Sequence, residues 1–147
     1  MFRKIIVTFF VLLGLTVSGV SSMEPPIFAK KGIAINGYDP VAYIEQISAN
    51  EGSEEFSYDW MGATWKFISQ ENLDKFMASP EDYAPQYGGY CAYAVANGYT
   101  ASTVPEAFTV HEGKLYLNYS KGVERRWRQN MQNYIVSGDK NWPEVLE

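Results

Sequence analysis

The sequence predicts a small, single-domain α+β protein with two β-hairpins packed on short helices and a longer C-terminal helix. Two stretches in which apolar residues alternate around a turn, 56–68 and 107–118, predict the hairpins. Apolar residues that recur every three or four positions from Ser120 onward predict the long helix. The chain has 147 residues, which is enough for one domain with its own core.

Residues 1–22 are predicted to be a secretory signal peptide. Arg3 and Lys4 precede thirteen uncharged residues, 5–17, and small residues suited to cleavage follow at 17–22. An uncleaved anchor is the alternative, but this stretch falls short of the ~20 residues that a membrane-spanning helix needs. We therefore expect a periplasmic or secreted protein of residues 23–147 that has no stable membrane anchor after cleavage.

The charge and the cysteine content narrow the classes of partner. Without Arg3 and Lys4, ten basic side chains stand against seventeen acidic ones, so the net charge is −7. Such a surface repels a phosphate backbone, and we expect no nucleic-acid partner. Cys91 is the only cysteine, which leaves three readings: a buried inert thiol, a reactive or metal-binding thiol, or half of an intermolecular bridge.

The N-terminal half begins with a short strand at 33–35 that Asn36-Gly37 ends. A helix then starts at Pro40, because Asp39 can cap it and proline suits the first helical position. Residues 46–55 are polar and predict a loop.

The first hairpin is predicted from strands at 56–58 and 63–68, joined through 59–62. Ser69 follows as the N-cap of a short amphipathic helix whose apolar stripe is Leu73, Phe76 and Met77. Ser79-Pro80 ends that helix.

Residues 81–99 are the most unusual stretch, with five of the eleven tyrosines and the lone cysteine. Gly88-Gly89 predicts a close approach of backbone segments. A helix over 89–96 would place Tyr87, Tyr90 and Tyr93 on one face. That face either packs in the core or lines a groove with phenol groups.

The second hairpin is predicted at 107–111 and 114–118 around Glu112-Gly113, with Val110 opposite Leu115 and Phe108 opposite Leu117 on the core side. The other face would carry Thr109, His111, Lys114 and Tyr116. His111 is thus expected to be a surface residue.

The C-terminal helix carries Val123, Trp127 and Met131 on its apolar stripe and is expected to end at residues 137–139. Arg125, Arg126 and Arg128 lie on its other faces, where they are either solvated or meet an anion or an acidic partner. Trp142 is expected to pack back on the domain.

No catalytic constellation is apparent, and we expect no enzyme. The single cysteine and the single histidine could in number form one catalytic Cys–His pair, but His111 is expected to face outward. The adjacent carboxylates Glu54-Glu55 lie in the predicted loop, and no nucleophile-elbow motif occurs.

Five motifs along the chain form a recognisable set: Gly37-Tyr38-Asp39-Pro40-Val41-Ala42-Tyr43, Trp65-Lys66-Phe67, Leu73-Asp74-Lys75-Phe76-Met77-Ala78-Ser79-Pro80-Glu81-Asp82-Tyr83, Tyr87-Gly88-Gly89-Tyr90-Cys91-Ala92-Tyr93-Ala94 and Gly113-Lys114-Leu115-Tyr116-Leu117-Asn118-Tyr119. Together they resemble the YHS domain of exported bacterial proteins with a C-terminal extension. The resemblance covers residues 23–147 and implies a small α+β module associated with metal handling. Metal-binding relatives carry cysteines where this chain has Ala42, Ile68 and Asn72, so the resemblance implies that this cysteine site is lost.

Two functions follow as expectations. The first is an exported binding protein that handles copper or another soft metal, with Cys91 as a metal ligand and His111 or methionines as co-ligands. The alternative is a metal-free module for a periplasmic protein partner or a small ligand, in which Cys91 is structural. Its candidate ligand-binding residues are Tyr38, Asp39, Tyr87, Tyr90 and Tyr93.

Overall fold

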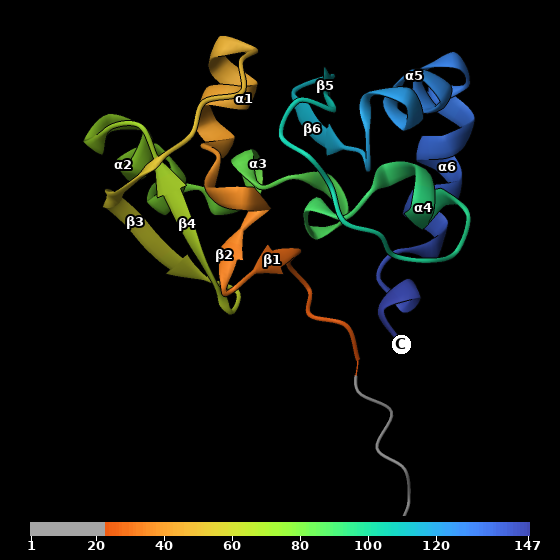
Figure 1. Cartoon of the computed structure of the whole chain (residues 1–147), viewed down its shortest axis with the longest axis horizontal. Coiled ribbons are helices and arrows are strands. Elements are labelled where there is room, and N and C mark those ends of the chain that lie inside the picture. Colours follow the sequence, from red (N-terminus) through yellow and green to blue (C-terminus); the bar gives the residue numbers. More distant parts are fainter. Residues whose placement is uncertain (1–22) are drawn as a thin grey trace, which may run out of the picture.

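The computed structural model describes residues 23–147, so the predicted signal peptide lies outside the described residues. In this range the fold is α+β, as predicted, with two sheets and six α-helices (Figure 1). The elements are β1 (Ala29–Lys30), β2 (Ile33–Ala34), α1 (Pro40–Gln46), β3 (Ser53–Trp60), β4 (Ala63–Phe67), α2 (Gln70–Ala78), α3 (Pro80–Tyr83), α4 (Ala92–Ala96), β5 (Phe108–His111), β6 (Lys114–Leu117), α5 (Lys121–Gln129) and α6 (Met131–Asn141). Within residues 23–147, no helix has the length and apolar character needed to cross a membrane.

The N-terminal half is a four-stranded sheet in the order β1-β2-β4-β3, with α1 and α2 beside it (Figure 1). Only the pairing of β2 with β4 is parallel. Asp39 and Ser69 cap α1 and α2 through their side chains, which confirms both predicted helix starts. Trp65, Phe67 and Phe76 are fully buried and centre the core of this half.

Two details of this half differ from the prediction. β3 begins at Ser53, inside the predicted loop, because Ser53 pairs with Phe67 across a bulge in the strand. Met77 is 49% exposed rather than part of the apolar stripe of α2. The core contacts of α2 come instead from Leu73 and Phe76.

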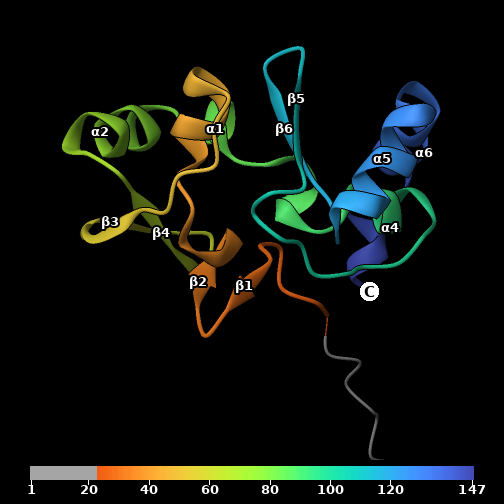
Figure 2. The ribbon, with the colours of Figure 1, turned by 45° about the horizontal axis from the view of Figure 1, so that its top comes forward.

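The β5–β6 hairpin stands between α1 and α5 (Figure 2). The predicted register is confirmed, with Phe108 opposite Leu117 and Val110 opposite Leu115. The predicted solvent face is wrong, because Thr109 and Tyr116 are buried. Helix α5 covers that face, and the Tyr116 ring lies 5.0 Å from the ring of Trp127. The molecule has two hydrophobic clusters, one around Trp65 and Phe76 and one around Trp127. The hairpin contributes Leu115 and Leu117 to the first and Tyr116 to the second.

The predicted long C-terminal helix is two helices. Helix α5 begins directly after Ser120, as expected, and the Ser120 side chain caps it. The backbone leaves the helical region at Asn130, and α6 then continues to Asn141. The expected end at residues 137–139 is wrong, since Gly138 lies inside α6 against the ring of Tyr87.

The predicted helix over 89–96 is shorter than expected, because α4 begins only at Ala92. Tyr87 and Gly88 have positive φ values of 57° and 62° in a short 3₁₀ segment, Gln86–Gly89. The predicted close approach is confirmed there, since a Cβ on Gly88 would collide with the carbonyl oxygen of Pro26. Tyr87, Tyr90 and Tyr93 consequently do not share one helix face.

Candidate functional site

The Asp39 carboxylate is fully buried and joins three segments of the N-terminal half. Its Oδ1 accepts hydrogen bonds from the backbone N–H groups of Val41 (2.8 Å) and Ala42 (3.0 Å). Its Oδ2 accepts from the Ile68 N–H (2.9 Å) and from Asn72 Nδ2 (2.8 Å). With two donors on each oxygen, the carboxylate is committed to the structure of the domain.

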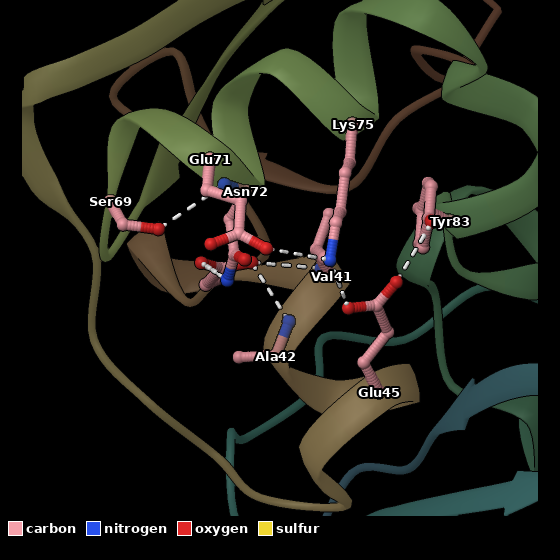
Figure 3. Close-up of polar contacts among 9 residues, drawn as sticks. Val41, Ala42, Glu45, Ser69, Glu71, Asn72, Lys75 and Tyr83 are labelled. Atoms are coloured by element: carbon pink, nitrogen blue, oxygen red, sulfur yellow. Dashed lines mark hydrogen bonds and ion pairs between the residues drawn. The ribbon is translucent and has the colours of Figure 1, made fainter.

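Asp39 also brings together the three positions at which metal-binding YHS domains, which the sequence resembles, carry cysteines. Ala42, Ile68 and Asn72 each donate one of its hydrogen bonds. Ala42 on α1 and Asn72 on α2 are drawn in Figure 3. An alanine, an isoleucine and an asparagine supply neither thiolate nor imidazole for a soft metal.

A polar network on the surface ties α1, α2 and α3 together (Figure 3). Lys75 Nζ lies 2.8 Å from Glu45 Oε2 and 3.1 Å from Glu71 Oε1, and the Tyr83 hydroxyl donates to Glu45 Oε1 at 3.0 Å. The hydrogen bond from Lys75 lowers the pKa of the Glu45 carboxyl. These groups pair with one another, and the network serves to dock the three helices.

The structure does not gather the five predicted ligand-binding residues into one site. Tyr38 lies in the N-terminal half, 6.5 Å from the ring of Tyr43, and Asp39 is enclosed beside it. The rings of Tyr87 and Tyr90 both lie near Trp142, at 6.1 Å and 6.3 Å. Tyr93 packs elsewhere, 5.3 Å from the ring of Tyr134.

The hydroxyl groups of Tyr87 and Tyr90 already have partners within the protein. Tyr87 donates to Asp139 Oδ1 at 2.8 Å, and Tyr90 donates to the carbonyl oxygen of Pro25 at 2.8 Å. Burial and the hydrogen bond to Asp139 raise the pKa of Tyr87 well above its ordinary value. Both phenols therefore pack the core of the C-terminal half.

Cys91, the predicted metal ligand, is 1% exposed and directly precedes α4. Its Sγ lies 3.5 Å from Asn118 Oδ1, and burial raises the pKa of the thiol. Within residues 23–147, no group of three or more His, Cys, Asp and Glu side chains could hold a metal ion. The thiol is therefore largely shielded from solvent.

His111 lies apart from the cysteine. It pairs with Lys114 at the turn end of the β5–β6 hairpin, and its Nε2 is 3.8 Å from Glu112 Oε1. Asn118, which touches Cys91, follows the opposite end of β6. The four residues of that strand span about 13 Å, so Cys91 and His111, which the sequence left as a possible pair, do not come together.

A groove of about 580 Å³ is lined by residues from both halves of the molecule. Its walls include Trp60 beside the β3–β4 turn, Glu81 of α3 and Lys114 of the second hairpin. Tyr87, Asp139 and Trp142 line it from the C-terminal half. Of the residues expected to bind a ligand, only Tyr87 belongs to this groove.

The two indole rings of the groove are held by the cores behind them. Trp60 lies 5.7 Å from the ring of Trp65 and 5.6 Å from that of Phe76, and Trp142 lies against Tyr87. Asp139 is fixed by the Tyr87 hydroxyl. The groove thus combines two positioned apolar surfaces with two carboxylates and one ammonium group, an arrangement that suits a small amphipathic ligand.

No protein-family model, curated protein or solved structure matches this chain. The groove and the surroundings of the thiol are therefore the features of the molecule that bear on its function. Sequence reasoning missed Trp60, Glu81 and Asp139, which come from segments far apart along the chain. One signal was present, since Trp60-Met61 places two large apolar residues at a hairpin turn where polar residues are usual.

Proposed function

We propose that the protein is an exported, YHS-like binding protein that works without a metal and holds a small amphipathic ligand in the groove between its halves. The observation that carries the proposal is the groove itself, lined by Trp60 and Trp142 and by the charged side chains of Glu81, Lys114 and Asp139. Its volume of about 580 Å³ falls within the range of about 300–1,000 Å³ typical of small-molecule sites.

The charges of the groove favour a ligand that carries a positive charge. Glu81 and Asp139 contribute two carboxylates against the single ammonium group of Lys114. The face of an indole ring also attracts a cation. A ligand with an aromatic or aliphatic body and one amino group would match both the walls and the charge.

The surroundings of Cys91 favour this reading over the handling of copper. The thiol is buried, and its Sγ contacts the side-chain oxygen of Asn118, which is not a soft ligand. At the positions of the family's cysteines, Ala42, Ile68 and Asn72 surround a carboxylate that already has four hydrogen bonds.

The groove is tested with three probes of one shape and different charge: phenethylamine, 2-phenylethanol and 3-phenylpropionate. We expect phenethylamine to shift the NMR signals of the Trp60 and Trp142 indole N–H groups, with a smaller effect of the alcohol and none of the carboxylate. Trp127 is fully buried and is absent from the groove lining, so its indole signal is the internal control. Glu81→Gln should weaken the binding of phenethylamine, and equal responses to all three probes would overturn the proposed preference.

The metal hypothesis is tested by anaerobic titration of the purified protein with Cu(I) against a competing chelator, with Cys91→Ala and His111→Ala alongside. We expect no stoichiometric complex that survives the competitor. Tight one-to-one binding that disappears in Cys91→Ala would replace our proposal with a copper-binding function.

A further inference from the structure

The exposed face of α5 is basic in an otherwise acidic protein. Arg125, Arg126 and Arg128 are exposed. Among residues 23–147, none of the three side chains takes part in an ion pair. Because the described chain carries a net charge of −7, three unpaired guanidinium groups on one nine-residue helix mark a local site for negative charge.

Arg126 is positioned by a neighbouring ring, and Arg125 lies beside it along the helix. The guanidinium carbon of Arg126 lies 6.0 Å from the centre of the Tyr93 ring, which in turn packs on Tyr134. A Cβ added to Gly122 would lie 3.7 Å from Arg125 Nη2, so the Arg125 side chain lies over the first turn of α5. Neither guanidinium group forms an ion pair within residues 23–147, so both can donate hydrogen bonds to a partner.

A small apolar pocket lies directly beside Arg126. It has a volume of about 240 Å³ and is lined by Tyr93, Ala94, Tyr99, Ala101, Tyr119 and Val123, with Cys91 also in its wall. Tyr93 is shared between the pocket and the contact with Arg126. Val123 precedes Arg126 by three positions and is therefore its neighbour on the helix surface.

The rim of this pocket is aromatic and open to solvent. Tyr99 is 50% exposed and Tyr119 is 55% exposed. Tyrosine and arginine are the residue types that dominate the energetics of protein interfaces. The pocket accommodates one apolar side chain, while the positive charges lie outside it on the helix, so an occupant that uses both must extend across the surface.

We propose that this surface, formed by the pocket and by Arg125 and Arg126, docks a partner protein through a segment in which an apolar side chain is flanked by carboxylates. The apolar side chain enters the pocket between Tyr99 and Tyr119. The flanking carboxylates pair with the two guanidinium groups, which can each bind a carboxylate through two hydrogen bonds. This inference is independent of the groove, which lies elsewhere and has other lining residues.

The test uses the purified protein and the blocked, fluorescently labelled peptide Glu-Asp-Leu-Phe-Asp-Glu. We expect it to bind at low ionic strength, with NMR shifts at Tyr93, Tyr99 and Tyr119. The matched peptides Glu-Asp-Ala-Ala-Asp-Glu, without the anchors, and Lys-Lys-Leu-Phe-Lys-Lys, with reversed charge, should each bind at least tenfold more weakly. No binding of the first peptide at 1 mM, or equal binding of all three, would overturn the proposal.

Variants of α5 locate the interaction. Arg125→Ala together with Arg126→Ala should weaken binding of the acidic peptide at least tenfold and reduce its dependence on salt. Arg128→Ala is the matched control, since Arg128 lies two positions beyond Arg126 and therefore on the opposite side of the helix from the arginine that contacts Tyr93. An equal loss in Arg128→Ala would overturn the assignment to the pocket. Sedimentation that shows a dimer, abolished by the double variant, would identify the occupant as a second copy and overturn the proposed partner.

Discussion

Each half of the molecule buries one carboxylate, and the two carboxylates differ in how many hydrogen-bond partners the protein gives them. Asp39 accepts four hydrogen bonds from α1, the end of β4 and α2. Glu124 of α5 is 2% exposed and has one side-chain partner, Lys121 Nζ at 3.0 Å from its Oε1. Its Oε2 is buried without a partner in the protein. Both oxygens of the Asp39 carboxylate are fully hydrogen-bonded within the protein, whereas only one oxygen of Glu124 has a partner there.

The same contrast extends to other buried polar groups. Within residues 23–147, the buried side-chain atoms without a partner all belong to the C-terminal half: Thr109 Oγ1, Asn118 Nδ2, Glu124 Oε2 and Trp127 Nε1. A buried water is the usual partner of such groups. The N-terminal half thus satisfies its buried polar side chains within the protein, whereas the C-terminal half leaves these four buried atoms without a protein partner.

The largest effect is expected from removal of the satisfied carboxylate. Asp39→Ala leaves four donors without an acceptor, two of them on the first turn of α1, and should lower the free energy of unfolding by at least about 3 kcal/mol. Urea denaturation followed by circular dichroism measures the loss. Asp39→Asn keeps one carbonyl oxygen and should cost less than Asp39→Ala. A loss below about 1 kcal/mol in Asp39→Ala would contradict the role given to this group.

Close packing in the C-terminal half is tested at Gly138. A Cβ there would lie 2.6 Å from the Tyr87 hydroxyl oxygen, so Gly138→Ala should destabilise the protein by about 2 kcal/mol. Gly122→Ala on α5 is the matched control, because its nearest contact would be at 3.7 Å. Without a clash, that change should stabilise the helix by up to about 1 kcal/mol. Thermal unfolding of the two variants should shift in opposite directions, and a shared direction would refute the packing argument.

The Tyr87 hydroxyl should have a smaller effect and a characteristic pH dependence. Tyr87→Phe removes the hydrogen bond to Asp139 and should cost about 1 kcal/mol near pH 7. Burial raises the pKa values of Tyr87, Tyr90 and Tyr116 above the ordinary 10.0. The unfolded chain then ionises first, so stability is fully present below pH 10 and is lost as the pH rises through and beyond that value.

Alkaline denaturation monitored by circular dichroism checks this expectation. The wild-type protein should lose stability steeply above pH 10, and Tyr87→Phe should lose it less steeply because one raised pKa is absent. Identical slopes for the two proteins above pH 10 would show that Tyr87 does not contribute to the linkage.

Local signals in the sequence sufficed for much of the fold. The caps at Asp39 and Ser69 depend on one side chain and the next three residues, and both form as expected. The register of β5 with β6 follows from a two-residue turn. Other features were not visible in local patterns. Helix α5 buries the hairpin face that the alternation of polar and apolar residues predicted to be exposed. The break at Asn130 divides the predicted C-terminal helix, although the apolar stripe continues across it.

The candidate site was less accessible to sequence reasoning than the fold. The tyrosines near Cys91 were expected to share a face, but the positive φ values of Tyr87 and Gly88 turn the chain before α4 begins. Glycine at 88 indicated such a turn, whereas a tyrosine at 87 does not. The groove combines Trp60 with Trp142, eighty-two positions apart along the sequence, and no local pattern relates them.

The smallest change in the free energy of unfolding is expected at Glu124. It allows the buried carboxylates of the two halves to be compared through the same chemical substitution. Glu124→Gln preserves the shape of the side chain and removes a charge that has one partner, so the free energy of unfolding should change by less than about 1 kcal/mol. The same chemical change at Asp39, Asp39→Asn, replaces an oxygen that accepts two hydrogen bonds and should cost clearly more. Chemical denaturation of the two variants under one condition compares them directly. Equal losses would mean that Glu124 is as well accommodated as Asp39, with buried water as the missing partner, and the proposed difference between the two halves would fail.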